Sequence, residues 1–182
     1  MPYQTRCGTI LYVEDNEDDV FFVRLSFTKL GLGHLFHNLR NGREIVDYLA
    51  GSGKGAGAGL HPLPAVLMLD LHLPLLSGLE VLDWVRHQRR FTAMPVVIFS
   101  ASSNPEERRK ALAMGASEFI EKPNSSLKFI HLIQQLVDHW HFGAAGSAGF
   151  SGQFGGSVVD DFPGLSGFAP ASRTPTHHSA GF

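Results

Sequence analysis

Apolar residues along the chain occur either in short continuous runs or at three- and four-residue steps. The continuous runs at 9–13, 65–70 and 94–100 contain β-branched residues and predict buried strands. The shorter segments 34–40 and 117–120 are also predicted strands. Apolar residues at three- or four-residue spacing share one face of a helix, so the periodic segments predict amphipathic helices. These helices are expected at 16–30, 41–50, 77–88, 104–115 and 125–141.

Strands and helices therefore alternate from one end of the patterned region to the other. Continuous apolar strands joined by helices predict a parallel sheet that is covered on both faces. Right-handed crossovers leave few topologies. We expect an α/β fold with a doubly wound, five-stranded parallel sheet in the order 2-1-3-4-5, which is the flavodoxin-like arrangement. The functional site of such a sheet lies at the carboxyl ends of the strands, near strands 1 and 3.

Composition divides the chain into two unequal parts. The patterned part predicts one domain at 8–142, and the rest, 143–182, is rich in Gly, Ser, Ala and Pro. A segment of this composition has no long apolar face to bury, so we expect a flexible tail. The whole chain has 182 residues, of which 43% are hydrophobic.

Charge and cysteine content exclude several classes of protein. A formal charge of -2 and a pI of about 6.5 do not indicate a nucleic-acid partner. Cys7 is the single cysteine, so it cannot form an internal disulfide, which fits a reducing compartment. No run reaches about 18 uninterrupted apolar residues, so no membrane span is expected. Acidic residues come too early for a signal peptide, and we expect a cytoplasmic protein.

Carboxylates follow two neighbouring strands of the predicted sheet. Strand 1 runs into Glu14 and Asp15, and the buried run "VLML" runs into Asp70. Like charges about 4 Å apart repel by about 4 kcal/mol at an effective dielectric constant of 20. A divalent cation would make such a cluster tolerable. Because all the ligands are oxygens, the expected ion is Mg²⁺, for which Mn²⁺ can substitute.

The other strand ends carry groups that suit phosphoryl chemistry. Strand 4 ends at Ser100, and Lys122 follows strand 5. A carboxylate can act as a nucleophile and carry a phosphoryl group, whose oxygens then need positive charge and hydrogen-bond donors. The glycine-rich segment 51–59 lacks the spacing of a nucleotide-binding P-loop, so nucleotide binding is unsupported.

The motifs "VEDN", "LDLHLP…SG", "FSAS" and "FIEKP", each at a predicted strand end, resemble those of the receiver domain of two-component response regulators. More narrowly, "VEDNEDDVFFVRLSF", "DLHLPLLSGLEVL", "SSNPEE" and "HWHF" resemble the stand-alone response regulators associated with phytochrome-type histidine kinases. The resemblance implies that Asp70 accepts a phosphoryl group from a sensor histidine kinase. It also implies that the protein is not an enzyme and loses the phosphoryl group by at most slow autodephosphorylation. Glu14, Asp15 and Asp70 would hold Mg²⁺, with the backbone carbonyl of His72 as a further ligand.

The resemblance also implies a conformational switch. Ser100 would move toward the phosphate, and Phe119 would swing inward behind it. Lys122 would pair with the phosphate, and a cis peptide bond is expected between Lys122 and Pro123. Output would be by protein contact, directly or through a histidine phosphotransfer protein.

His72 departs from the pattern, because close relatives usually have Asn there. A metal contact through the backbone carbonyl should survive this change. We hypothesise that the His72 side chain, which flanks the phosphate, alters the rate of dephosphorylation or its pH dependence.

The last predicted helix has apolar residues on more than one face. One stripe contains Leu127, Ile130, Ile133, Leu136, Val137 and Trp140. Phe129, Leu132 and Phe142 fall outside it. A helix with two apolar faces must cover a second surface, so we expect a homodimer through this helix.

Two alternatives from other functional classes stay open. One is a scaffold that retains the fold but does not depend on phosphorylation, although it would have no use for the acid–Ser–Lys set. The other is an Mg²⁺-dependent phosphohydrolase with an aspartyl-phosphate intermediate. That chemistry usually requires an acid two residues after the nucleophile, where this chain has His72.

Overall fold

The computed structural model describes residues 8–52 and 64–140. Its sheet has five parallel strands in the order β2-β1-β3-β4-β5, which confirms the predicted topology. The strands are β1 (Ile10–Val13), β2 (Phe36–Leu39), β3 (Val66–Leu69), β4 (Val96–Ser100) and β5 (Glu118–Glu121). The predicted tail at 143–182 lies outside the described residues.

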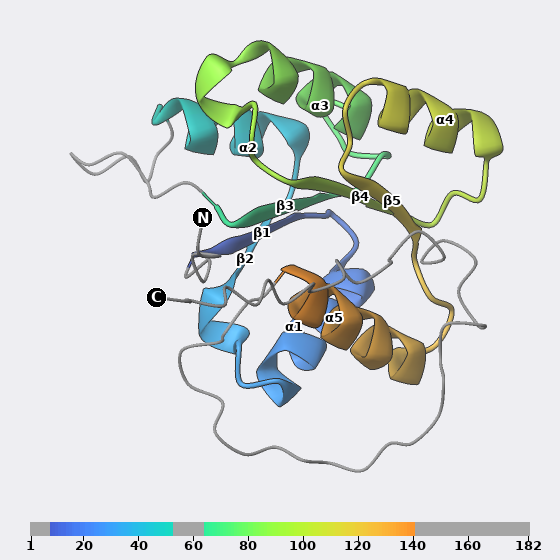
Figure 1. Cartoon of the computed structure of the whole chain (residues 1–182). Helices are drawn as coiled ribbons and strands as arrows, with labels where there is room; N and C mark the ends of the chain where they lie inside the picture. The colour runs from blue at the N-terminus through green and yellow to red at the C-terminus, as the bar shows by residue number, and fades with distance from the viewer. Residues whose placement is uncertain (1–7, 53–63, 141–182) are drawn as a thin grey trace, which may run out of the picture. The chain divides into compact units, whose positions relative to one another are not determined.

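The predicted helices are all present, and helices cover both faces of the sheet (Figure 1). α2, α3 and α4 lie on one face, and α1 and α5 lie on the other. The helices are α1 (Glu17–Lys29), α2 (Gly42–Ala50), α3 (Gly78–His87), α4 (Pro105–Ala113) and α5 (Ser126–Trp140). Two 3₁₀ turns that the sequence analysis missed, η1 (Gly33–Leu35) and η2 (Arg89–Phe91), precede β2 and β4. No described helix has the length and apolar character needed to cross a membrane.

Side-chain caps set where the helices begin. Asn16, Asn41 and Asn104 each accept hydrogen bonds from backbone N–H groups in the first turn of the following helix. Ser77 and Glu80 form a capping box at the start of α3. These caps satisfy donors that have no partner inside the helix. The capped first turns of α1 and α3 lie against residues of the site described below, through Asp19 and Gly78 respectively.

The core differs in character on the two sides of the sheet. On the α1/α5 side, aromatic rings pack in sequence: Tyr12 lies tilted against Phe36 and Phe99, and Phe99 meets Phe129 edge-on. The other side is mainly aliphatic and contains Val13, Leu69, Val81, Leu82 and Ile98, all fully buried. Burial of both sheet faces explains why the strands read as continuous apolar runs.

The predicted division of α5 into two apolar faces is wrong for the side chains that the structure describes, which do not include those of Trp140 and Phe142. Phe129 and Leu132, predicted to lie outside the core stripe, are buried together with Ile133, whereas Leu127 is 71% exposed. The reason is helical phase: positions 129, 132, 133, 136 and 137 recur at three- and four-residue steps and form one buried face. The homodimer stays a prediction, but the buried side chains of Phe129 and Leu132 do not support it.

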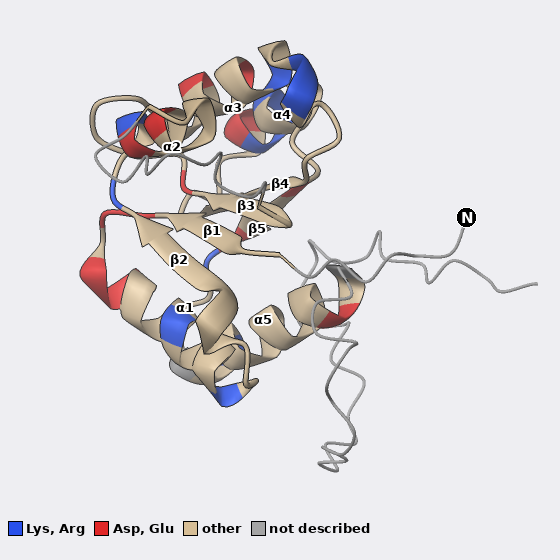
Figure 2. Cartoon of the chain, turned by 90° about the vertical axis from the view of Figure 1, so that its left-hand side faces the viewer, with Lys and Arg blue, Asp and Glu red and all other residues tan. Residues whose placement is uncertain are grey.

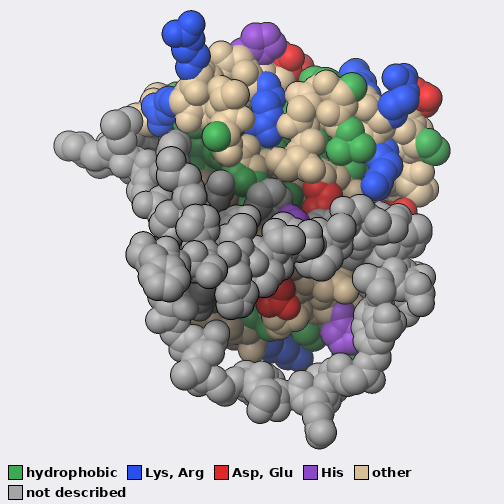
Figure 3. Space-filling model, viewed as in Figure 1, with side chains coloured by type: hydrophobic (Ala, Val, Ile, Leu, Met, Phe, Trp, Pro, Cys, Tyr) green, Lys and Arg blue, Asp and Glu red, His purple; other side chains and the backbone are tan. Residues whose placement is uncertain are grey.

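Basic side chains gather over α3 and α4 in the space-filling view (Figure 3). Several of them have partners within the domain. Arg86 donates to the backbone oxygens of Gly115 and Met94, and Arg109 pairs with Glu106 in the same helix. Part of this positive charge is therefore used in contacts within the domain.

Glu118 at the start of β5 is a buried acid. It is 9% exposed, and its Oε1 atom has no hydrogen-bond partner. Burial raises the pKa of the Glu118 carboxyl to about 7, while Arg108 opposes the rise. An ionised carboxylate is therefore disfavoured at this position in the folded state.

This burial predicts a pH-dependent stability. Because the folded-state pKa of Glu118 lies above its unfolded value of 4.5, its contribution to the free energy of unfolding is lost as pH rises from about 4.5 to about 7. Glu118→Gln should remove that loss and stabilise the protein above pH 7 by up to about 3 kcal/mol. Urea denaturation of both proteins at pH 5 and pH 8 measures the difference. An equal effect of the substitution at both pH values would contradict the assignment.

Candidate functional site

The predicted site residues meet at one edge of the sheet. Glu14 follows β1, Asp70 follows β3, Ser100 ends β4 and Lys122 follows β5. The first turn of α1 brings further acidic residues to the same edge, as Figure 2 shows. The strand order makes β1 and β3 neighbours, which brings carboxylates from distant parts of the sequence together.

The Lys122 ammonium lies at the centre of this cluster. It contacts Glu14 Oε2, lies 2.9 Å from Asp19 Oδ2 and lies 3.4 Å from Asp70 Oδ1. The side chains of Lys122, Glu14 and Asp70 are all nearly inaccessible to solvent. One buried cation is therefore shared by three carboxylates, two of them deeply buried.

Glu14 is fixed by several donors. Its Oε2 atom accepts a hydrogen bond from the Tyr12 hydroxyl at 2.9 Å, and its Oε1 atom accepts one from the Asn16 backbone N–H at 3.1 Å. Burial raises the pKa of Glu14, against the opposing effect of Lys122. Burial also raises the pKa of Tyr12, and the nearby Glu14 charge adds to that rise. Tyr12 therefore stays a hydrogen-bond donor to Glu14.

Lys122 stays positively charged in spite of its burial. Desolvation lowers its pKa, but the attraction of Asp70 and Glu14 outweighs desolvation, and the pKa is raised. A protonated ammonium has three donors and no acceptor, which suits it to contact anionic oxygens.

Asp70 is held by the backbone around it. Its Oδ2 atom accepts a hydrogen bond from the His72 N–H at 2.9 Å, and its own N–H donates to the Val13 carbonyl. The His72 side chain points away from this backbone contact and lies 3.7 Å from Glu107 Oε1 on α4. The loop therefore presents the Asp70 carboxylate toward Lys122, while the His72 imidazole is largely exposed.

Asp15 is not part of the Lys122 cluster and is exposed. Within residues 8–52 and 64–140, no three His, Cys, Asp or Glu side chains form a ready metal site. The donor types nonetheless suit a hard divalent cation, because Glu14, Asp15 and Asp70 offer only oxygen ligands. The expected cluster of three convergent carboxylates is thus only partly formed, because Glu14 and Asp70 face Lys122.

Asp19 is a member of the cluster that the sequence analysis missed. The helix dipole by itself favours acidic residues in the first turn of α1, so an acid at this position does not on its own indicate a contact with Lys122. A usable signal was its place three residues after the cap Asn16, where the first turn runs beside the end of β1.

Ser100 and Phe119 are both buried. Ser100 Oγ accepts a weak hydrogen bond from the Ser102 N–H at 3.4 Å, and the Ser100 carbonyl accepts one from the Lys122 N–H at 2.8 Å. Phe119 is 2% exposed and packs in the aliphatic side of the core. The Arg108 guanidinium lies 5.6 Å from the centre of its ring and donates to its carbonyl. The ring therefore occupies an inward position.

The expected cis peptide bond between Lys122 and Pro123 is wrong for this structure. The described residues contain no cis peptide bond. A trans bond before proline is favoured by about 0.5–1 kcal/mol, and the Lys122 side chain reaches the carboxylates without the cis form.

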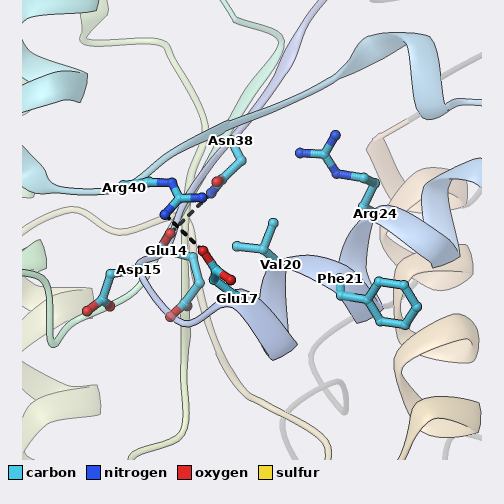
Figure 4. Close-up of a pocket in the computed structure, with 8 residues that line it drawn as sticks. All are labelled: Glu14, Asp15, Glu17, Val20, Phe21, Arg24, Asn38 and Arg40. Carbon is cyan, nitrogen blue, oxygen red and sulfur yellow. Dashed lines mark hydrogen bonds and ion pairs between the residues drawn. The ribbon is translucent and has the colours of Figure 1, made fainter.

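A cleft of about 240 Å³ lies between α1 and the ends of β1 and β2 (Figure 4). Arg40 spans its mouth and pairs with Glu17, and Arg24 lies over the Phe36 ring. Pockets that bind small molecules usually measure about 300–1,000 Å³. The cleft is lined by Glu14, Asp15, Glu17, Val20, Phe21, Arg24, Asn38 and Arg40. It therefore borders the acidic cluster without forming a typical ligand pocket.

Residues 10–134 match the model of the response regulator receiver domain. The match covers well over half of the chain, so the chain belongs to the receiver-domain family. Its sheet order and helices agree with this assignment.

Individual relatives agree with the family. The chain is 30% identical over 131 residues to a probable methanogenesis regulatory protein, FilR2, of Methanothrix harundinacea (strain 6Ac), which covers 72% of this chain and 82% of that protein. Other curated relatives are named as a phosphodiesterase and a methylesterase, but the chain spans only 24% and 27% of them. Those names therefore describe proteins of which the matched part is about a quarter.

Solved structures share the fold. The Mn²⁺-bound form of the response regulator Rcp1 superposes with a TM-score of 0.67 at 23% identity, covering 78% of this chain and 99% of that chain. The bacteriophytochrome response regulator AtBRR superposes with a TM-score of 0.57 at 33% identity, covering 71% of this chain and 91% of that chain.

Gly78 lies too close to the Asp70 backbone to be replaced by a residue with a side chain. A Cβ atom on Gly78 would lie 2.1 Å from the Asp70 carbonyl oxygen. Gly78→Ala should lower the free energy of unfolding by about 1–3 kcal/mol, because the backbone must shift to relieve the overlap. Urea denaturation measures the loss. Gly33→Ala serves as the control, since its closest neighbour is the Thr28 hydroxyl. Equal losses for the two variants would refute the backbone clash.

Proposed function

We propose that the protein is a response regulator that accepts a phosphoryl group on Asp70 from a sensor histidine kinase. The observation that carries this proposal is the buried Asp70 carboxylate, which lies 3.4 Å from the buried Lys122 ammonium at the carboxyl edge of the sheet. A buried cation beside a buried nucleophile is suited to stabilise the charge of a transferred phosphoryl group. Membership of the receiver-domain family supports the same role.

In the proposed reaction, an Asp70 carboxylate oxygen attacks the phosphorus of a phosphohistidine. The new P–O bond forms as the P–N bond breaks, and the imidazole nitrogen keeps the electron pair of that bond. Lys122 donates hydrogen bonds to phosphoryl oxygens, and the Ser100 hydroxyl donates to another. Later attack of water on phosphorus releases inorganic phosphate and restores the Asp70 carboxylate. We propose that this autodephosphorylation is slow, so that the protein acts as a phosphoacceptor rather than as an enzyme.

We propose that Glu14, Asp15, Asp70 and the His72 carbonyl hold Mg²⁺, and that Mn²⁺ can replace it. The oxygen-only donor set and the Mn²⁺ bound by the related fold of Rcp1 support a divalent cation. A bound cation would neutralise charge on the phosphoryl oxygens. Because Glu14 now contacts Lys122, this role requires its carboxylate to turn toward the cation.

The proposed output is protein contact in the cytoplasm. Ser100 approaching the phosphoryl group would be coupled to Phe119, which is buried on the neighbouring strand β5. The similarity to AtBRR, at 33% identity, supports a phytochrome-type kinase as the donor, with onward transfer to a histidine phosphotransfer protein as a further route. A switch of this kind works when the phosphoryl group binds one of two conformations better.

Two other functions are less well supported. A phosphorylation-independent scaffold does not require a lysine buried among three carboxylates. An aspartyl-phosphate phosphohydrolase requires an acid or base near the leaving group. The side chain at the relevant place, His72, is directed toward Glu107.

Intact mass measurement tests the proposed chemistry. With Mg²⁺ and acetyl phosphate, the wild type should gain one phosphoryl group, because the Asp70 carboxylate displaces acetate. The adduct should be absent from Asp70→Asn and from samples without a divalent cation. If no adduct is detected, binding of beryllofluoride separates a short-lived phosphoryl group from an inactive site. Absence of both responses would favour the scaffold.

A further inference from the structure

Lys122 has a partner that the proposed chemistry does not use. Asp19 Oδ2 lies 2.9 Å from Lys122 Nζ, closer than the proposed phosphoacceptor, whose Oδ1 lies at 3.4 Å. Asp19 comes from the first turn of α1, whereas Asp70 follows β3. Its side chain is 25% exposed, whereas that of Lys122 is 6% exposed.

Two hydrogen bonds hold the ammonium in its present position. Lys122 donates to Glu14 and Asp19, and Asp70 Oδ1 lies at ion-pair distance, 3.4 Å away. A phosphoryl group on Asp70 would add oxygens that also need a donor from Lys122. Movement of the ammonium toward those oxygens would weaken its present hydrogen bonds.

Asp19 is the partner that still holds Lys122 when the phosphoryl group arrives. In the proposed function Glu14 turns toward the divalent cation, so the cation replaces Lys122 as its partner. Asp19 is partly exposed, so water can replace the ammonium. The competition for Lys122 therefore lies between Asp19 and the incoming phosphoryl group.

We propose that Asp19 is a positioning residue that holds Lys122 on the α1 side of the site and competes with the phosphoryl group for its ammonium. This inference rests on the proposed function. Competition for the hydrogen bond and repulsion between two anions act in the same direction. Asp19 thus weakens phosphoryl binding and limits how long the phosphorylated state lasts.

Asp18 provides a matched control for this role. The backbone N–H groups of Asp18 and Asp19 both donate to the Asn16 side chain, at 2.9 and 3.2 Å. Both acids therefore belong to the same capped turn and interact similarly with the helix dipole. Asp19 contacts Lys122, whereas Asp18 is exposed.

Titration with beryllofluoride in the presence of Mg²⁺, followed by fluorine NMR of the full chain, tests the proposal. Asp19→Asn should bind this phosphoryl mimic on the order of 3- to 10-fold more tightly than the wild type. Asp18→Asn should change the affinity by less than about twofold, because its charge is exposed and screened. Asp19→Glu, which keeps the carboxylate, should restore the wild-type affinity. A gain in affinity is not the result expected from local structural damage.

A Lys122→Met background tests whether Asp19 acts through the ammonium. The gain from Asp19→Asn should fall below about twofold there, because the shared partner is absent. A gain of full size in that background would indicate repulsion without competition and overturn the proposal. Weaker binding by Asp19→Asn, or equal effects of Asp18→Asn and Asp19→Asn, would overturn it as well. Failure of the wild type to bind beryllofluoride would count against the proposed function itself, whereas normal wild-type binding with unchanged variants would count against Asp19 only.

Discussion

The structure of the site depends on one buried ammonium group. Lys122 contacts carboxylates that reach it from the end of β1, the first turn of α1 and the end of β3. Without that positive charge, the buried Glu14 and Asp70 would be costly in the folded state. The acids in turn keep the lysine protonated in spite of its burial. Each side of the cluster therefore requires the other.

The same interaction leaves an excess of negative charge at the sheet edge. One lysine faces three carboxylates, and Asp15 adds a fourth acid nearby without joining the cluster. Such an edge suits a divalent cation. An incoming anion, however, would contact Lys122 at the expense of the carboxylates that now contact it. This exchange takes place at Lys122, because an anion bound to Asp70 would compete with the present carboxylates for its ammonium group.

Helix capping connects this chemistry to the fold. The Asn16 side chain begins α1 and so brings Asp19 against Lys122, while the Asn16 N–H holds Glu14. On the other side, the capped start of α3 places Gly78 against the Asp70 backbone. The residues that end strands and begin helices therefore determine both local structure and the geometry of the carboxylates.

The sequence by itself determined the strand and helix order, because period and run length reflect burial on one or both faces of each element. It also predicted that Glu14, Asp70, Ser100 and Lys122 lie at one edge of the sheet, since parallel strands bring their carboxyl ends together. Only the tertiary structure decided which acids contact Lys122: Asp15 precedes the cap of α1 and is exposed, whereas Asp19 lies in the first turn and reaches the ammonium. It likewise decided the buried face of α5, where Phe129 and Leu132 pack inward because α1 and the sheet select one helical phase. Pairwise contacts between distant segments depend on the packing of whole elements, and a linear pattern does not encode them one residue at a time.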